Sequence, residues 1–184
     1  MIHLIRHGAT DQPMLRPPGD LTPATLEEWA QDYGLNARGQ AEATALRPWL
    51  ERLGAPDRVL SSPKRRTLET ASLAAPQLTP TTDELLHEWH GDEPADRLHA
   101  RVRHLLARGE NEALWCFTHG GFIRAVVAAL VVGEDMSSFE PVFHGLRRSL
   151  HIWNASVTWV GHGPSGLELI SVNQSPALDE LLGK

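Results

Sequence analysis

The 184-residue sequence is short of three features that would each assign it to a class of protein. It has one cysteine, Cys116, so no disulfide can form within the chain. No apolar run reaches the roughly 20 residues that a membrane-spanning helix needs. Basic residues are not in excess, since 17 Lys and Arg stand against 23 Asp and Glu, a formal net charge of -6. The composition therefore argues against a disulfide-stabilised protein, a membrane protein and a general nucleic-acid binder.

The remaining composition is that of an ordinary globular protein, with 41% hydrophobic and 22% charged residues. Its length suits a sizeable core, and we expect one domain over residues 1–184. Residues 1–8 do not read as an export signal because Arg6 and His7 interrupt the apolar stretch. We therefore expect a cytoplasmic protein. Cys116 lies in the apolar run 113–117 and is predicted to be a buried thiol.

The order of apolar segments predicts an α/β fold. Short runs at residues 1–5, 58–61 and 113–118 read as strands, with helical patterns between them. This alternation favours a three-layer αβα sandwich around a mostly parallel central sheet. Runs at 150–153, 156–160 and 167–172 predict three further strands near the C-terminus. Their connections are too short for crossovers, so at least one antiparallel strand is expected there.

Helical periodicity predicts which faces are buried. Residues 43–53 carry apolar side chains at helical spacing, but Pro48 should kink or break that helix. The pattern over 98–108 predicts an amphipathic helix, with three arginines on a solvated face. The run 122–132 is apolar nearly all round and predicts a buried helix. The three arginines are Arg97, Arg101 and Arg108, and the tryptophans expected in the core are Trp29, Trp49, Trp115, Trp153 and Trp159.

Residues 12–34 are predicted to form a lid or loop insertion over the site. Three prolines and a glycine in residues 12–20 require a loop. Thr22 can then cap a helix that has Pro23 in its first turn.

Chemistry-bearing residues follow each of the three predicted N-terminal strands. RHG at residues 6–8 and THGG at 118–121 end two of them, and SSPKRR at 61–66 ends the third. In a parallel α/β sheet these groups meet at one edge, where ligands bind. Glycines allow close approach of the backbone, and helix N-termini attract anions. Because an imidazole can attack phosphorus and arginines match phosphoryl oxygens, a phosphate site is predicted.

The motifs resemble, in order and over nearly the whole chain, those of the histidine phosphatase superfamily, which is also called phosphoglycerate mutase-like. They are LIRHGAT at 4–10, LNARG at 35–39 with Glu42 beyond it, SPKRRTLETA at 62–71, LHE at 86–88, THGG at 118–121 and NASV at 154–157. The last is common in the phosphatase branch. A single tripeptide would be weak evidence, but the order and spacing together make the resemblance specific.

The resemblance implies a two-step phosphoryl transfer. His7 would be the nucleophile and form a phosphohistidine, while Glu88 would protonate the leaving alcohol and then activate water. Positive charge around the phosphoryl group would come from side chains, so neither a cofactor nor a metal is expected. The expected phosphate-binding residues are Arg6, Gly8, Thr10, Arg16, Arg66 and His119.

Some assignments stay open on the sequence alone. Glu84 and Glu93 are carboxylates close to Glu88 that could serve as the acid instead. Lys64 and Arg124, like Arg16, could enter the pocket or lie outside it. Arg65 is expected at the surface. The run of His87, Glu88 and His90 lacks the i, i+4 spacing and the third ligand of a metal site.

The function that these residues favour is hydrolysis of a small phosphorylated metabolite by a monomer or homodimer. A cofactor-dependent mutase is the alternative enzyme. Relatives of that kind usually carry a longer insertion before the second histidine than residues 76–111 provide here. The third alternative is a non-catalytic module that binds a phosphorylated ligand. Such a module would have lost His7 or the acid, and both are present.

Overall fold

The computed structural model describes residues 1–12, 31–133, 135–164 and 166–176. Six strands of these residues form one sheet in the order β3-β2-β4-β1-β5-β6. The first four in that order run parallel to one another. Strand β5 pairs antiparallel with β1, and β6 pairs antiparallel with β5. Their bounds are β1 Ile2–Arg6, β2 Arg58–Ser61, β3 Thr81–Thr82, β4 Leu114–Thr118, β5 Val157–Gly163 and β6 Gly166–Gln174.

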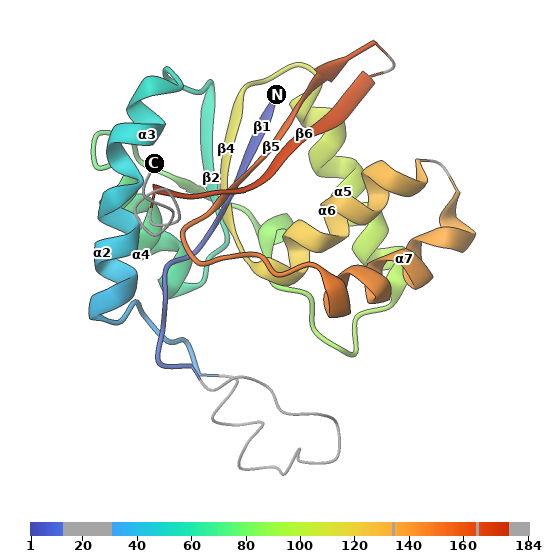
Figure 1. Ribbon diagram of the computed structural model, residues 1–184, viewed down its shortest axis with the longest axis horizontal. Helices are drawn as coiled ribbons and strands as arrows, with labels where there is room; N and C mark the ends of the chain where they lie inside the picture. The colour runs from blue at the N-terminus through green and yellow to red at the C-terminus, as the bar shows by residue number, and fades with distance from the viewer. Residues whose placement is uncertain (13–30, 134, 165, 177–184) are drawn as a thin grey trace.

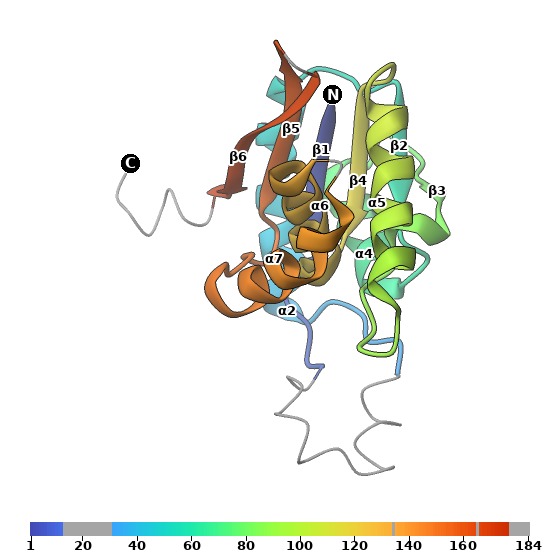
Figure 2. The ribbon, with the colours of Figure 1, turned by 90° about the vertical axis from the view of Figure 1, so that its right-hand side faces the viewer.

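Helices cover both faces of this sheet, which confirms the predicted three-layer sandwich (Figures 1 and 2). One face carries α2, α3 and α4, and the other carries α5, α6 and α7. A short 3₁₀ turn, η2, precedes α5. The bounds are α2 Ala37–Ala45, α3 Arg47–Arg52, α4 Arg65–Ala74, η2 Glu84–Leu86, α5 Ala95–Gly109, α6 Gly120–Val132 and α7 Met136–Ser149.

The strand period of two divides the buried side chains between two cores. Along β4, Leu114 and Cys116 pack with α5, α6 and α7, while Trp115 and Phe117 pack on the opposite side. Both faces of β4 are therefore apolar, as expected of a strand in the middle of a parallel sheet. Cys116 is fully buried, as predicted, and burial raises the pKa of its thiol, so it is a packing residue.

Most predicted elements are confirmed within one or two residues. The break at Pro48 is real, because α2 ends at Ala45 and Pro48 lies in the first turn of α3. The apolar stripe of 98–106 is buried in α5, and most of α6 is buried as well. The helix α7 was not predicted, although Phe139, Val142, Phe143 and Leu146 follow helical spacing and pack on the core; Pro141 lies inside it.

The prediction of a strand at 150–153 is wrong. The carbonyl of Leu150 accepts from Arg124 Nε at 2.6 Å, and that of Ile152 accepts from Arg6 Nη1. The carbonyl of His151 accepts from Asn173 Nδ2. These side chains occupy the acceptors that a neighbouring strand would need, so the segment is an extended loop. Trp153, predicted in the core, is 46% exposed on this loop.

Two of the three arginines predicted on the solvated face of α5 are in ion pairs instead. Arg101 forms a bidentate pair with Glu93 at 2.7 and 2.6 Å, and Arg108 pairs with Asp83 at 2.6 Å. Arg101 Nη1 also donates to the carbonyls of Leu85 and His87. These bonds tie the segment after β3 to α5 and thereby hold the chain on either side of Glu88.

Part of the sequence-based analysis concerns residues that the structure does not describe. The proline-rich loop, the helix expected after Thr22, and Trp29 lie outside the described residues. The predicted lid over 12–34 falls mostly there. None of the described helices combines the length and the apolar character needed to cross a bilayer.

We predict that His3 makes the fold sensitive to acid. Its ring stacks on Trp159 at 5.6 Å, and its Nε2 is buried without a hydrogen-bond partner among the described residues. Burial, followed by the N-terminal amine, lowers the pKa of His3 to about 4. The unfolded chain, with a pKa of about 6.5, binds more protons between these values, so stability falls as pH falls from about 6.5 to 4.

The variant His3→Phe should therefore lose less stability than the wild type between pH 7 and pH 4.5 in urea unfolding. His162→Gln is the matched control, because His162 is exposed and lies on β5 in the same sheet. A wild-type pH dependence in His3→Phe would contradict the assignment.

Candidate active site

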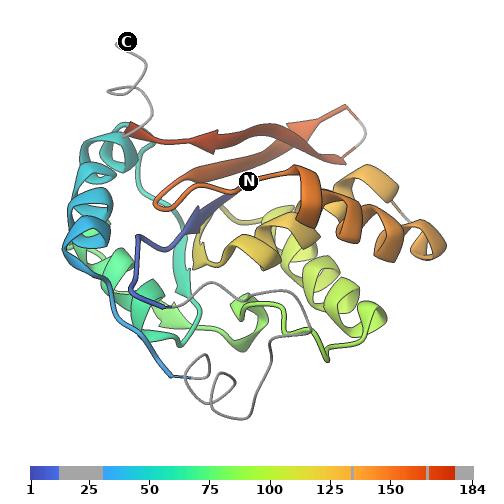
Figure 3. The same cartoon turned by 60° about the horizontal axis from the view of Figure 1, so that its bottom comes forward.

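Two histidines leave the sheet side by side. Strands β1 and β4 pair in parallel with Arg6 opposite Thr118, so His7 and His119 follow at the same edge. Their ring centroids are 5.3 Å apart at an interplanar angle of 63°, and both residues are buried. Figure 3 turns this carboxyl edge of the sheet toward the viewer. The predicted convergence of the two motifs is confirmed.

The ring of His7 is held in one tautomer. Its Nδ1 lies 2.8 Å from the carbonyl oxygen of Gly8, which can only accept, so Nδ1 carries the hydrogen and Nε2 keeps its lone pair. Burial lowers the pKa of His7 well below its usual value, and Arg6 and Arg66 lower it further. His7 therefore presents a neutral imidazole whose Nε2 carries no hydrogen.

The loop that carries His7 is braced by neighbouring motifs. The N–H of Gly8 donates to Thr70 Oγ1 in α4 at 3.1 Å, and the next N–H donates to Glu42 Oε2 at 2.9 Å. A Cβ on Gly8 would overlap the carbonyl oxygen of Gly39 at the start of α2. Glycine is required at both positions because the two backbones approach within contact distance.

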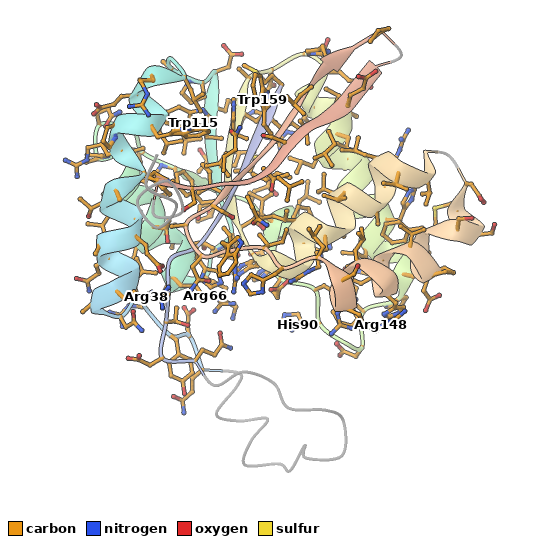
Figure 4. All side chains as sticks on the ribbon, in the orientation of Figure 1. Arg38, Arg66, His90, Trp115, Arg148 and Trp159 are labelled. Atoms are coloured by element: carbon orange, nitrogen blue, oxygen red, sulfur yellow. The ribbon has the colours of Figure 1, made fainter. Side chains whose placement is uncertain are left out.

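Arg66 and His119 form a buried pair. Arg66, in the first turn of α4, donates through Nε to His119 Nδ1 at 3.3 Å. Because Nδ1 accepts, the hydrogen of the neutral ring is on Nε2, which lies 2.9 Å from Ser62 Oγ. Burial, then His7 and Arg66, lower the pKa of His119 well below its usual value. Figure 4 labels Arg66 at the opposite end of the sheet from Trp115 and Trp159.

Ser62 is a site residue that the sequence analysis did not single out. Its hydroxyl is fully buried and is the partner of His119 Nε2. Its position in the sequence could have indicated this role, because Ser62 directly follows β2 at the strand end where the other site residues lie.

Arg6 reaches the same edge from the last position of β1. Its Nη1 donates to Ile152, while its Nε is buried with no acceptor among the described residues. Burial lowers the pKa of Arg6, Glu88 raises it, and Arg124 lowers it. A buried N–H without a partner is costly, so this donor is prepared to meet an anion.

The carboxylate of Glu88 lies on the N-terminus of α6. Its Oε1 accepts from the N–H of Trp89 at 2.9 Å and from that of Phe122 at 3.2 Å. A Cβ on Gly121 would overlap this oxygen. Phe122 lies in the first turn of α6, so the start of this helix fixes Oε1 as an acceptor. Glu88 is thereby held against the start of α6, the helix that directly follows His119.

The structure distinguishes Glu88 from the two other candidate acids. Glu84 is exposed and pairs with His87 at 2.6 Å, and Glu93 is engaged by Arg101. A cavity of about 630 Å³ borders Glu88 on the side of α5. Its other lining residues are Asp83, Glu84, Leu85, His87, His90, Asp92, Glu93, Pro94, Arg97 and Arg101. Glu88 therefore lies between this cavity and the histidines.

The other candidate residues are placed as follows. Arg65 is exposed and pairs with Glu69 at 2.6 Å, as its predicted surface role requires. Lys64 is half-buried directly before α4. The hydroxyl of Thr10 accepts from a backbone N–H two residues on, within its own loop. Arg16 lies outside the described residues.

A mixed α/β fold with two histidines at adjacent strand ends defines a class of phosphate-handling proteins. Residues 2–95 match the family model of the histidine phosphatase superfamily (branch 1). The chain belongs to this superfamily.

Solved structures share the fold over almost the whole chain. An open reading frame product of Mycobacterium tuberculosis matches with a TM-score of 0.70 and 22% identity, covering 95% of this chain and 97% of the other. A phosphoserine phosphatase from Entamoeba histolytica matches at 0.66 and 18%, covering 94% and 96%. A mycobacterial glucosyl-3-phosphoglycerate phosphatase matches at 0.65 and 23%, covering 95% and 98%. No curated protein is similar enough in sequence to match this chain.

We predict that Ser62→Ala destabilises the protein by roughly 1–3 kcal/mol, because the buried Nε2–H of His119 loses its acceptor. Urea unfolding at pH 7 measures the change. Ser149→Ala is the matched control, since this exposed hydroxyl bonds only within α7. Equal stability of Ser62→Ala and the control would contradict the assigned tautomer.

Proposed function

We propose that this protein is a phosphomonoesterase that hydrolyses a small phosphorylated metabolite through a phosphohistidine on His7. The observation that carries the proposal is the unprotonated Nε2 of His7, oriented by the Nδ1–H bond to Gly8 and flanked by Arg66 and His119. A neutral, oriented imidazole beside fixed cations suits attack on a phosphate monoester.

In the first step, His7 Nε2 forms a bond to phosphorus as the bond from phosphorus to the ester oxygen breaks. Arg6 and Arg66 bind the phosphoryl oxygens and stabilise the charge that develops on them. The Nε2–H of His119 leaves its hydrogen bond to Ser62 Oγ and donates to a phosphoryl oxygen instead. Glu88, protonated at Oε2, gives its proton to the departing alcohol. The Gly8 carbonyl stabilises the positive charge that His7 acquires.

In the second step, water attacks the phosphohistidine. The Glu88 carboxylate takes the proton of this water, and the bond from phosphorus to Nε2 breaks to release inorganic phosphate. This restores the neutral ring of His7 and the protonated acid. No cofactor or metal enters either step.

The superfamily and the similar structures support hydrolysis. Two of those structures are phosphatases by name, acting on phosphoserine and on glucosyl-3-phosphoglycerate. Their shared chemistry is cleavage of a phosphate monoester of a small metabolite.

The variant His7→Ala should lower turnover of p-nitrophenyl phosphate by several orders of magnitude, because the step that forms the phosphohistidine is lost. Release of inorganic phosphate measures turnover, and circular dichroism checks that the variant is folded. Radiolabel from a labelled ester should be trapped on wild-type His7 and not on the variant. Comparable activity of the variant would rule the mechanism out.

The variant Glu88→Gln should slow alkyl phosphates by roughly 10²–10⁴-fold and aryl phosphates less, since a better leaving group needs less protonation. Gly121→Ala should reproduce this difference, because its added Cβ displaces the Glu88 carboxylate. Gly145→Ala is the helix control, with no atom within 4 Å of its added Cβ. Equal losses for both classes of ester would point to a different acid.

A further inference from the structure

The two glycines that open α6 lie between a pair of arginines and Glu88. A Cβ on Gly120 would be 3.3 Å from Arg124 Nη1 and 3.4 Å from Arg6 Nε. A Cβ on Gly121 would overlap the Glu88 carboxylate. Arg124 is therefore next to Arg6, at the same helix turn that holds the carboxylate.

A second arginine reaches this region from α7. The guanidinium carbon of Arg147 lies 4.1 Å from the ring centroid of Trp89, a cation–π contact. Trp89 follows Glu88 in the chain, donates to its carboxylate, and packs edge-on against Phe143 at 5.3 Å. Arg147 is exposed, and stacking on one face leaves the N–H groups at its edge available to an anion.

Neither arginine forms an ion pair with a carboxylate of the described residues. Burial lowers the pKa of Arg124, Glu88 raises it, and Arg147 lowers it, so these groups lie within electrostatic range. Arg124 Nε donates to a neutral carbonyl, that of Leu150. Among the residues that the structure describes, no ion pair joins Arg124 or Arg147 to an acid.

The proposed reaction sets the direction in which the substrate extends. Glu88 protonates the leaving oxygen, so the alcohol part of the ester lies beyond the phosphoryl group on the Glu88 side. A dianionic phosphoryl group matches the charges of Arg6 and Arg66, and Arg124 and Arg147 remain in excess. The cavity on the α5 side of Glu88 is lined by four acidic side chains besides Glu88 and by two arginines, of which Arg101 is already paired with Glu93. Acids therefore outnumber cations there, which disfavours an anion.

We propose that Arg124 and Arg147 bind a second anionic group, a carboxylate or a second phosphate, on the alcohol part of the substrate. The proposal rests on the proposed function, because that function places the leaving group beside Glu88. The substrate class is then a phosphate monoester that carries a further negative charge, rather than a neutral sugar or polyol phosphate.

Matched esters test this site. Phosphate esters of ω-hydroxyalkanoic acids of increasing chain length are compared with the phosphate esters of the corresponding diols, which replace the carboxylate with a neutral hydroxymethyl group. The diol bisphosphates distinguish a phosphate from a carboxylate. At a chain length that reaches the arginines, the charged ester should have a kcat/KM about tenfold above that of the diol ester, or roughly 1.4 kcal/mol.

Variants locate the preference. Arg147→Gln should bring the ratio of charged to diol ester close to one, through a raised KM for the charged ester. Arg148→Gln, which removes an equal exposed charge from the next position of α7, should keep the ratio within about twofold of wild type. Loss of the ratio in both variants would show a general charge effect and overturn the proposal.

Binding to His7→Ala, measured by calorimetry, makes the same comparison without turnover. Tighter binding of a charged ester than of its diol partner supports the site, and equal binding at every chain length overturns it. Hydrolysis of the diol esters by the wild type tests the proposed function separately. A protein that binds the charged esters tightly but hydrolyses none of them would contradict that function and keep the anion site.

Discussion

The parallel pairing of β1 with β4 is the constraint on which the rest of the site depends. It brings two histidines from opposite parts of the chain to within 5.3 Å of each other, measured between ring centroids. The same strand ends place Arg6 and the start of α6 beside them. Every other group of the site reaches this position from a neighbouring element. A change of register between these strands would separate the rings, however well each motif were preserved.

Burial of positive charge costs free energy in this arrangement. Arg6, Arg66 and Arg124 are drawn into the edge of the sheet, where desolvation lowers the pKa of each. Backbone carbonyls at 150 and 152 and the ring of His119 accept from their guanidinium groups. Both histidines stay neutral, so they add no further positive charge. The buried arginines therefore lack negative ion-pair partners among the described residues, and a bound anion would supply the negative charge that pairs with them.

Sequence reasoning succeeded where local patterns decide structure. The apolar runs of β1, β2 and β4, the break at Pro48 and the surface position of Arg65 follow from residue type and spacing. It failed at residues 150–153, where a strand-like pattern became a loop because arginine and asparagine side chains occupy the carbonyls. Trp153 is exposed for the same reason. Arg101 and Arg108 pair with acids from another segment, which no helical periodicity can reveal.

The sequence by itself determined the family, the mostly parallel character of the sheet and the identity of the two histidines, because each depends on short patterns of residues. The tertiary structure alone decided which carboxylate meets α6. The resemblance pointed to Glu88 and left Glu84 and Glu93 as alternatives. In the fold, ion pairs hold these two, and the N–H of Phe122 in α6 holds Glu88. It also decided the proton positions on both rings, since Gly8 and Arg66 reach them only after the chain folds. Contacts between distant segments set these features, and their partners cannot be read from local spacing.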